Sequence, residues 1–127
     1  MSVMVKPRIA TYEASAAIAK GLAVKLDSTG KKVTAVSATT DKSIGVAQNA
    51  AVNVGDLVEV ALSGGGAKGL AKATIAAGDI LGHNADGSIQ KAASANDRQI
   101  GIAMEAASAA DIFQMDVVVG MATQTQS

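Results

Sequence analysis

The sequence predicts a mainly β protein: a compact β-barrel or sandwich built from two pseudo-repeats of about 56 residues, with little helix and an extended N-terminal arm. Three observations predict it. The chain contains an internal repeat, apolar and polar residues alternate with a period of two, and turn residues occupy matching places in both copies.

The internal repeat is clearest in two heptads, DKSIGVA at residues 41–47 and DRQIGIA at residues 97–103. Upstream, KGLAVKLDSTGKKVTAV lies over AGDILGHNADGSIQKAA, and downstream VGDLVEVAL falls roughly on AADIFQMDVVV. We therefore expect a single domain with five segments. These are an N-terminal arm (1–14), repeat 1 (18–62), a Gly-rich linker (63–74), repeat 2 (75–120) and a polar tail (121–127).

The first strands of each copy should form a hairpin. LAVKL at residues 22–26 alternates as a half-buried strand does, and DSTG and NADG supply an Asx turn followed by a glycine. Gly55-Asp56 and Gly78-Asp79 each precede an apolar strand and indicate the turn that leads into it.

The repeated heptad itself is interpreted as scaffold. Ile44 with Val46, and Ile100 with Ile102, are expected to share one apolar face. Gly45 and Gly101 would allow close backbone approach or a bulge. Asp41 and Asp97 are expected to close turns.

Helix is hard to place in this sequence. The Ala-rich segments 14–21 and 105–111 have helix propensity, but neither carries an apolar stripe longer than two turns. At most one or two short helices are expected.

The composition predicts a thin core. Among 127 residues only Tyr12 and Phe113 are aromatic, so most apolar side chains are small. Such a domain gains from oligomerisation or from docking on a larger surface.

Charge and cysteine content limit the classes of partner and of chemistry expected for this chain. Eleven basic and eleven acidic residues are scattered without blocks, which argues against nucleic acid and against a membrane. Cysteine is absent, which excludes disulfides and thiolate chemistry. No apolar run has the length of a signal peptide or a membrane span, so we expect a soluble protein used without export.

The segment GGGAKG at residues 64–69 fits the glycine pattern of dinucleotide-binding loops. Such a loop must be followed by a helix and a second strand, and here LAKATIAAGD stops after about two turns. We therefore interpret it as a flexible linker and expect no cofactor.

An alternative is a small lipoyl- or biotinyl-like carrier, or another ligand-binding β-domain. Lys42 would be the modified lysine of a carrier. Against this, the matching position in the second copy is Arg98, and Ile44-Gly45 follows the lysine at once.

Catalytic and metal sites are not indicated. His83 is the only histidine, and beside Asp79 and Asp86 it could in principle touch a metal, but a histidine next to a turn is expected to be solvent-exposed. The aspartates mostly stand at turn positions, and no pair is selected for acid–base work. We expect no catalytic residues, no metal and no enzymatic activity.

The segments IAAGDILGHNADGSIQKAA, DRQIGIAMEAA and ADIFQMDVVVG resemble the capsid cement or head decoration proteins of tailed bacteriophages. The family pattern falls on Ala76 to Leu81, Ala85 to Gly87, Arg98 to Ala103 and Ile112 to Val119. KSIGVAQNAA and GDLVEVALSGG match its style, so the resemblance covers nearly the whole chain.

The resemblance implies a mainly β protein of the virion, usually a homotrimer, made in the host cytoplasm and bound to the capsid exterior. It would stabilise the assembled head by bridging subunits of the major capsid protein. Within that interpretation, the capsid-interface candidates lie in the N-terminal arm, where an extended segment can add to a neighbour's sheet: Val3, Val5, Pro7, Ile9 and Tyr12.

Overall fold

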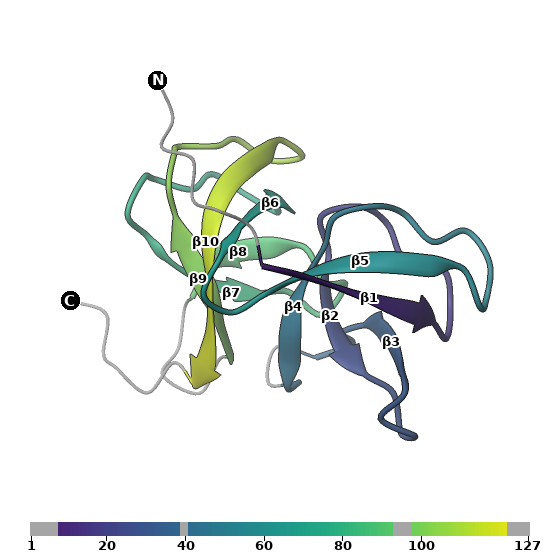
Figure 1. Ribbon diagram of the computed structural model, residues 1–127. Helices are drawn as coiled ribbons and strands as arrows, with labels where there is room; N and C mark the ends of the chain where they lie inside the picture. The colour runs from purple at the N-terminus through teal and green to yellow at the C-terminus, as the bar shows by residue number, and fades with distance from the viewer. Residues whose placement is uncertain (1–7, 39–40, 93–97, 122–127) are drawn as a thin grey trace.

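A computed structural model describes residues 8–38, 41–92 and 98–121, and within these ranges the chain is built from strands and turns. Ten strands follow one another along the chain (Figure 1): β1 Ile9–Ala14, β2 Ala23–Leu26, β3 Lys32–Ala35, β4 Ser43–Ala47, β5 Leu57–Leu62, β6 Gly66–Leu70, β7 Ile80–His83, β8 Ile89–Lys91, β9 Arg98–Ala103 and β10 Ile112–Met121. The described ranges hold no α-helix, and hence none long and apolar enough to span a membrane. The predicted mainly β fold is confirmed.

The first five strands form a closed barrel in the order β1-β3-β2-β4-β5. β2 is antiparallel to both β3 and β4, and β4 is antiparallel to β5. β1 closes the barrel, because it pairs antiparallel with β5 along one edge and parallel with β3 at Glu13 and Ala14 along the other.

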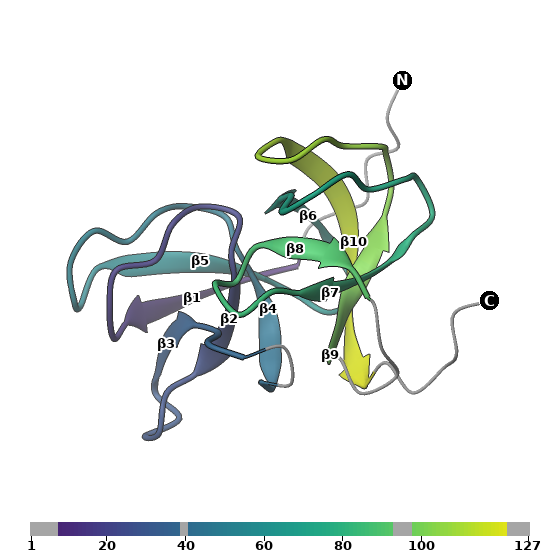
Figure 2. The same ribbon diagram turned by 180° about the vertical axis from the view of Figure 1, so that it is seen from behind.

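The last five strands repeat this arrangement in the order β6-β10-β9-β7-β8. β6 to β10 take the places of β1 to β5, and an isolated parallel bridge from Ala71 to Ile89 stands where β1 pairs with β3. The two halves lie side by side and are connected by the turn before β6 (Figures 1 and 2).

The Gly-rich segment 63–74 is therefore not the flexible linker that its composition suggested. Its residues Gly66–Leu70 are β6, which pairs with β10 from Ile112 to Asp116. Glycine and alanine are accepted there because the space is already filled: a Cβ on Gly69 would stand 2.9 Å from the sulfur of Met115.

Matching backbone contacts run through both halves. An isolated bridge joins Ile18 to Ala51 in the first half, and its equivalent joins Ile75 to Ala107 in the second. These bridges lie in or beside the two Ala-rich segments, and neither segment is helical. Local propensity is overridden because each segment finds hydrogen-bond partners on another loop.

The predicted hairpin turns are confirmed. Gly30 and Gly87 have φ values of 73° and 91°, and the amide of each donates to the carbonyl three residues earlier, at Asp27 and Asn84. Glycine adopts a positive φ at little steric cost, which explains why both turns have glycine at this position.

Three further turns share one design, in which an aspartate closes a four-residue turn with a positive φ at its third residue. They span residues 53–56, 76–79 and 108–111. In each, the aspartate amide donates to the first carbonyl and its carboxylate accepts the first amide, at 2.9–3.0 Å. The first two are the Gly-Asp turns predicted to lead into strands.

The repeated heptad contains a bulge in both copies, as its glycine suggested. Pairing between β2 and β4 shifts between Ser43 and Gly45, and pairing between β7 and β9 shifts between Gln99 and Gly101. A Cβ on either glycine would overlap a carbonyl oxygen, that of Ala61 or of Asp116.

The bulge makes one detail of the prediction wrong. Ile44 and Val46 do not share a face, because the extra residue reverses the alternation between them. Ile44 packs against the interior of the barrel, whereas Val46 joins the core between the halves.

Two apolar cores result. One fills the first barrel with Ala14, Ile18, Val24, Val33, Ala47, Ala51, Val58 and Val60. The other combines the interior of the second half, around Phe113 and Met115, with Ala23, Val46 and Ala61 from the outside of the first.

Each half contains one aromatic side chain, at opposite members of the same cross-strand pair. Tyr12 on β1 faces Val58 on β5, while Gly69 on β6 faces Phe113 on β10. The large ring therefore comes from the first strand in one half and from the last strand in the other. In each half, the larger side chain of the pair is matched by a smaller residue on the opposite strand.

Besides their shared core, hydrogen bonds from backbone groups and from the Gln48 side chain join the halves. The Leu70 amide donates to the Gly21 carbonyl, and the Ala23 amide donates to the Gly87 carbonyl. Gln48 satisfies both backbone groups of Lys68: its Nε2 donates to the carbonyl at 3.2 Å, and its Oε1 accepts the amide at 3.0 Å. Gln48 therefore covers the edge of β6 that β10 leaves free.

Candidate functional site

The five interface residues predicted from the sequence fall into two groups. Val3, Val5 and Pro7 lie outside the described residues. Ile9 and Tyr12 lie on β1, a strand of the closed barrel, so residues 9–14 do not form the extended arm expected from their sequence. The arm hypothesis accordingly moves to the residues before Ile9.

Ile9 and Tyr12 face different surroundings. Ile9 is 41% exposed on the outer face of β1, where it is available to a partner. Tyr12 is half-buried and its ring packs against the core of the first barrel. The burial of Tyr12 gives it a structural role that the sequence alone did not indicate.

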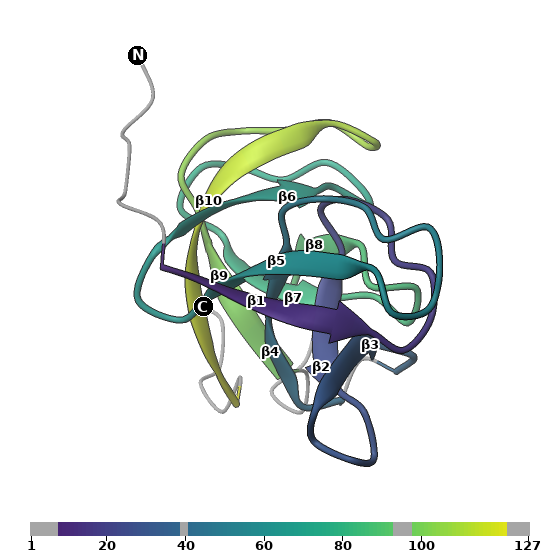
Figure 3. The same cartoon turned by 45° about the vertical axis from the view of Figure 1, so that its right-hand side comes forward.

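The described chain begins at the junction of the two halves. The Arg8 carbonyl accepts the Leu62 amide at 2.7 Å, and its guanidinium donates to the Ser63 carbonyl at 3.3 Å. Ser63 in turn holds the other half, because its hydroxyl accepts the Val119 amide at 3.2 Å. These bonds tie the start of the described chain to the end of β5, which lies beside β1 (Figure 3).

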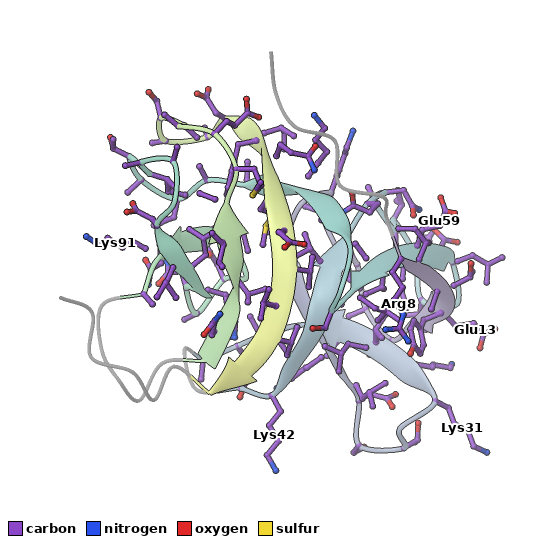
Figure 4. All side chains as sticks on the ribbon, turned by 60° about the vertical axis from the view of Figure 1, so that its left-hand side comes forward. Arg8, Glu13, Lys31, Lys42, Glu59 and Lys91 are labelled. Atoms are coloured by element: carbon purple, nitrogen blue, oxygen red, sulfur yellow. The ribbon has the colours of Figure 1, made fainter. Side chains whose placement is uncertain are left out.

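The outer face of β1 and β5 is a two-stranded ribbon that carries charge. Glu13 on β1 lies directly opposite Leu57 on β5, and Thr11 lies opposite Glu59. Glu13 and Glu59 point away from the body of the protein (Figure 4). Neither carboxylate forms an ion pair within the described ranges, where Lys25 and Asp41 form the salt bridge.

An exposed apolar group lies next to this ribbon. Val52, Val54 and Leu57 are 74%, 66% and 64% exposed, more than any other large apolar residue described. We call them the apolar tip. Sequence reasoning missed the apolar tip because it treated residues 54–62 as a repeat of 109–119 without asking where the copies differ.

Several aspartates are held in turns, as predicted, and their pKa values are lowered. The Asp41 carboxylate accepts hydrogen bonds from the Lys25 ammonium at 2.9 Å and from the Ser37 amide at 2.7 Å, which lowers its pKa to about 2. Hydrogen bonds from Thr29 and Ser88 similarly lower the pKa values of Asp27 and Asp86. Asp97 lies outside the described residues.

His83 is buried, with 1% of its surface exposed, so the expectation of a solvent-exposed histidine was wrong. It ends β7, one residue before the turn, and the strand carries it into the interior. Its Nδ1 lies 3.4 Å from the Asn84 carbonyl. No cluster of three or more metal-ligating side chains occurs in the part of the chain that the structure describes.

Lys42 is exposed and immediately precedes β4 (Figure 4). The strand before it, β3, does not pair with β4, because β2 lies between them. A carrier domain needs its lysine at the tip of a hairpin between paired strands. Lys42 therefore lacks the position that the carrier hypothesis requires.

The two comparisons with known proteins that find a match both find proteins of phages. A family model described as phage cement protein matches residues 40–121, which is more than half of the chain. A similar solved structure is the N-terminal base of the head fiber gp8.5 of bacteriophage phi29, with a TM-score of 0.67 and 19% sequence identity. The match covers 94% of this chain and 98% of that one. No curated protein matches in sequence.

Proposed function

The chain belongs to the phage cement protein family, and from this premise we propose that it binds the outer surface of the assembled phage head and stabilises the head by bridging subunits of the major capsid protein. Membership of the family makes it a structural protein of the phage head. The bridging, the capsid partner and the non-enzymatic role are the proposal.

The single observation that carries the proposal is the family match over residues 40–121. The fold shared with the base of a phage head fiber supports it, since both chains are matched over almost their whole length.

The proposed mechanism is linkage. A protein that binds the assembled shell more tightly than its separate subunits stabilises the shell by mass action. Many copies acting across subunit boundaries gain avidity without a strong individual contact. The proposal includes a homotrimer, because three linked copies multiply the number of contacts with the shell. It also places synthesis of the protein in the host cytoplasm.

The N-terminal arm is the first proposed contact, now confined to the residues before β1. Val3, Val5 and Pro7 would lie along a capsid subunit, Ile9 would extend the contact onto the barrel, and Tyr12 would anchor β1 in the core. An extended segment of this kind can add to an exposed sheet edge.

The experiment is a binding assay on heads assembled without this protein. Deleting residues 2–7 removes the arm but keeps every residue of β1, whereas a deletion through residue 12 would remove most of a barrel strand. A chain in which residues 2–7 are replaced by a Gly/Ser segment of equal length is the matched control for length. Loss of head binding in both variants, with unchanged unfolding, is expected; unchanged binding would contradict the arm contact.

A further inference from the structure

We propose that the apolar tip, formed by Val52, Val54 and Leu57, is a second docking surface for the shell of the phage head. This inference rests on the proposed function and names a part of the chain that meets the shell. Seven large apolar residues are exposed in the described chain, and three of them lie within residues 52–57. Concentrated apolar exposure of this kind is typical of an interaction site.

The turn that carries the two valines is held in place by the rest of the protein. The Asp56 carboxylate accepts the amides of Val52 and Asn53 at 3.1 and 3.0 Å. The Gly55 amide donates to the Ala14 carbonyl of β1 at 2.8 Å, which ties the turn to the barrel. The apolar side chains are therefore presented by a fixed backbone, and little loop entropy is lost when they are covered.

The second half shows that the turn does not need these valines. Its equivalent turn, residues 108–111, repeats the bonds of Asn53 and Gly55, with Ala109 in the place of Val54: the Asp111 carboxylate accepts the Ser108 amide, and the Ala110 amide donates to the Ala71 carbonyl. One residue fewer separates that turn from the bridging alanine, so Val52 has no equivalent. Folding of the four-residue turn alone does not explain the two exposed valines, since the equivalent turn forms with Ala109 in the place of Val54 and with no residue in the place of Val52.

The size of the apolar tip favours the shell over a second copy as its occupant. A stable two-protein interface buries about 800 Å² on each partner, from roughly 20–30 residues. Three side chains supply only a small part of that area. They suit a contact that is repeated over many copies on a lattice and combined with another contact, such as the arm.

The charges around the apolar tip indicate the chemistry of the partner surface. Glu13 lies opposite Leu57, and Glu59 lies two residues along the same face of β5. Lys32 is the neighbour of Glu13 on β3, and the two form no ion pair within the described ranges. An apolar patch with two unpaired carboxylates at its rim fits an apolar capsid surface rimmed by Lys or Arg.

The test compares two variants for binding to heads assembled without this protein. The tip variant carries Val52→Thr, Val54→Thr and Leu57→Thr. Threonine keeps the β-branched shape of the two valines in the turn, and at residue 57 it puts a β-branched residue on β5. The control variant carries Ile112→Thr and Val118→Thr, which are 46% and 37% exposed on β10, away from the tip. Thermal unfolding and sedimentation of the free proteins are measured alongside.

We expect the tip variant to bind heads at least about tenfold more weakly, with wild-type unfolding and sedimentation, while the control variant binds as wild type does. Wild-type binding by the tip variant would overturn the inference. So would a tip variant that changes the oligomeric state of the free protein, because the tip would then contact a second copy. If the unmodified chain does not bind heads at all, the proposed function itself fails, and this outcome is distinguishable from the others.

Discussion

Ala110 is the one non-glycine residue with a positive φ in the described chain, at 70°. It stands in the third position of the turn 108–111, where the equivalent turns have Gly55 and Gly78. The repeated backbone dictates this conformation, because the Ala110 amide must donate to the Ala71 carbonyl just as that of Gly55 donates to Ala14. An alanine in the left-handed region costs about 1–2 kcal/mol.

Replacing this residue, Ala110→Gly, should stabilise the protein. Relief of the strain exceeds the added entropy of the unfolded chain, which for glycine is about 0.4–1 kcal/mol, so a net gain of about 0.5–1 kcal/mol is expected. Denaturant unfolding measures it. The reverse change in the first half, Gly55→Ala, is the matched control and should destabilise; a loss of stability in Ala110→Gly would contradict the account.

Asp41 should make stability depend on pH in acid. Hydrogen bonds from Lys25 and then Ser37 lower its pKa in the folded protein to about 2, from an ordinary value of 3.8. A lowered pKa means that the stabilisation is complete above the unfolded value and is lost as the pH falls through the folded value. Unfolding followed from pH 5 to pH 2 should therefore show declining stability.

The variant Asp41→Asn isolates that contribution. It should be less stable than wild type at pH 6, and the difference should shrink toward pH 2, because the wild-type carboxylate is then being protonated. Equal acid slopes in the two proteins would show that other groups, such as Asp27 and Asp86, account for the dependence.

At the scale of elements, β6 shows how the repeat outweighs local composition. A Gly-rich segment has poor strand propensity, yet it forms a strand because β10 pairs with one edge and Gln48 covers the other. The second half has no equivalent of the Gln48 side-chain amide, because Met104 occupies that position. Gln48 is therefore specific to the junction.

Replacing Gln48 by the residue of the second copy, Gln48→Met, should loosen the junction. Two hydrogen bonds worth about 0.5–1.5 kcal/mol each are lost, and the Lys68 amide should exchange with solvent deuterium faster. The control is Asn49→Ala, because Asn49 makes a similar pair of bonds to Leu57 and Glu59 within the first half. Unchanged exchange at Lys68 in Gln48→Met would refute the capping role.

At the scale of the whole molecule, the sequence was informative where structure is local or repeated. Gly30, Gly87 and the Gly-Asp turns could be predicted, since a positive φ or a short-range carboxylate bond leaves a mark in a few adjacent residues. The bulges at Gly45 and Gly101 were likewise marked by their glycines.

What could not be predicted depends on contacts distant in sequence. Nothing local in residues 9–14 distinguishes an arm from a strand that closes a barrel, and the burial of His83 follows from the sheet around it. Comparing the copies more closely would have found the apolar tip, because Val52 is an insertion and because Val54 corresponds to the smaller Ala109 in the second copy. We propose that the halves form one domain, since the larger core draws residues from both.

The central claim, that this chain stabilises the phage head by bridging its subunits, is tested most directly by heating heads assembled without the protein, before and after saturation with it, and following the release of packaged DNA. The account predicts release at a temperature several degrees higher after saturation, with a smaller rise for the tip variant at the same concentration. Release at the same temperature from heads on which the bound protein is present in full would contradict it.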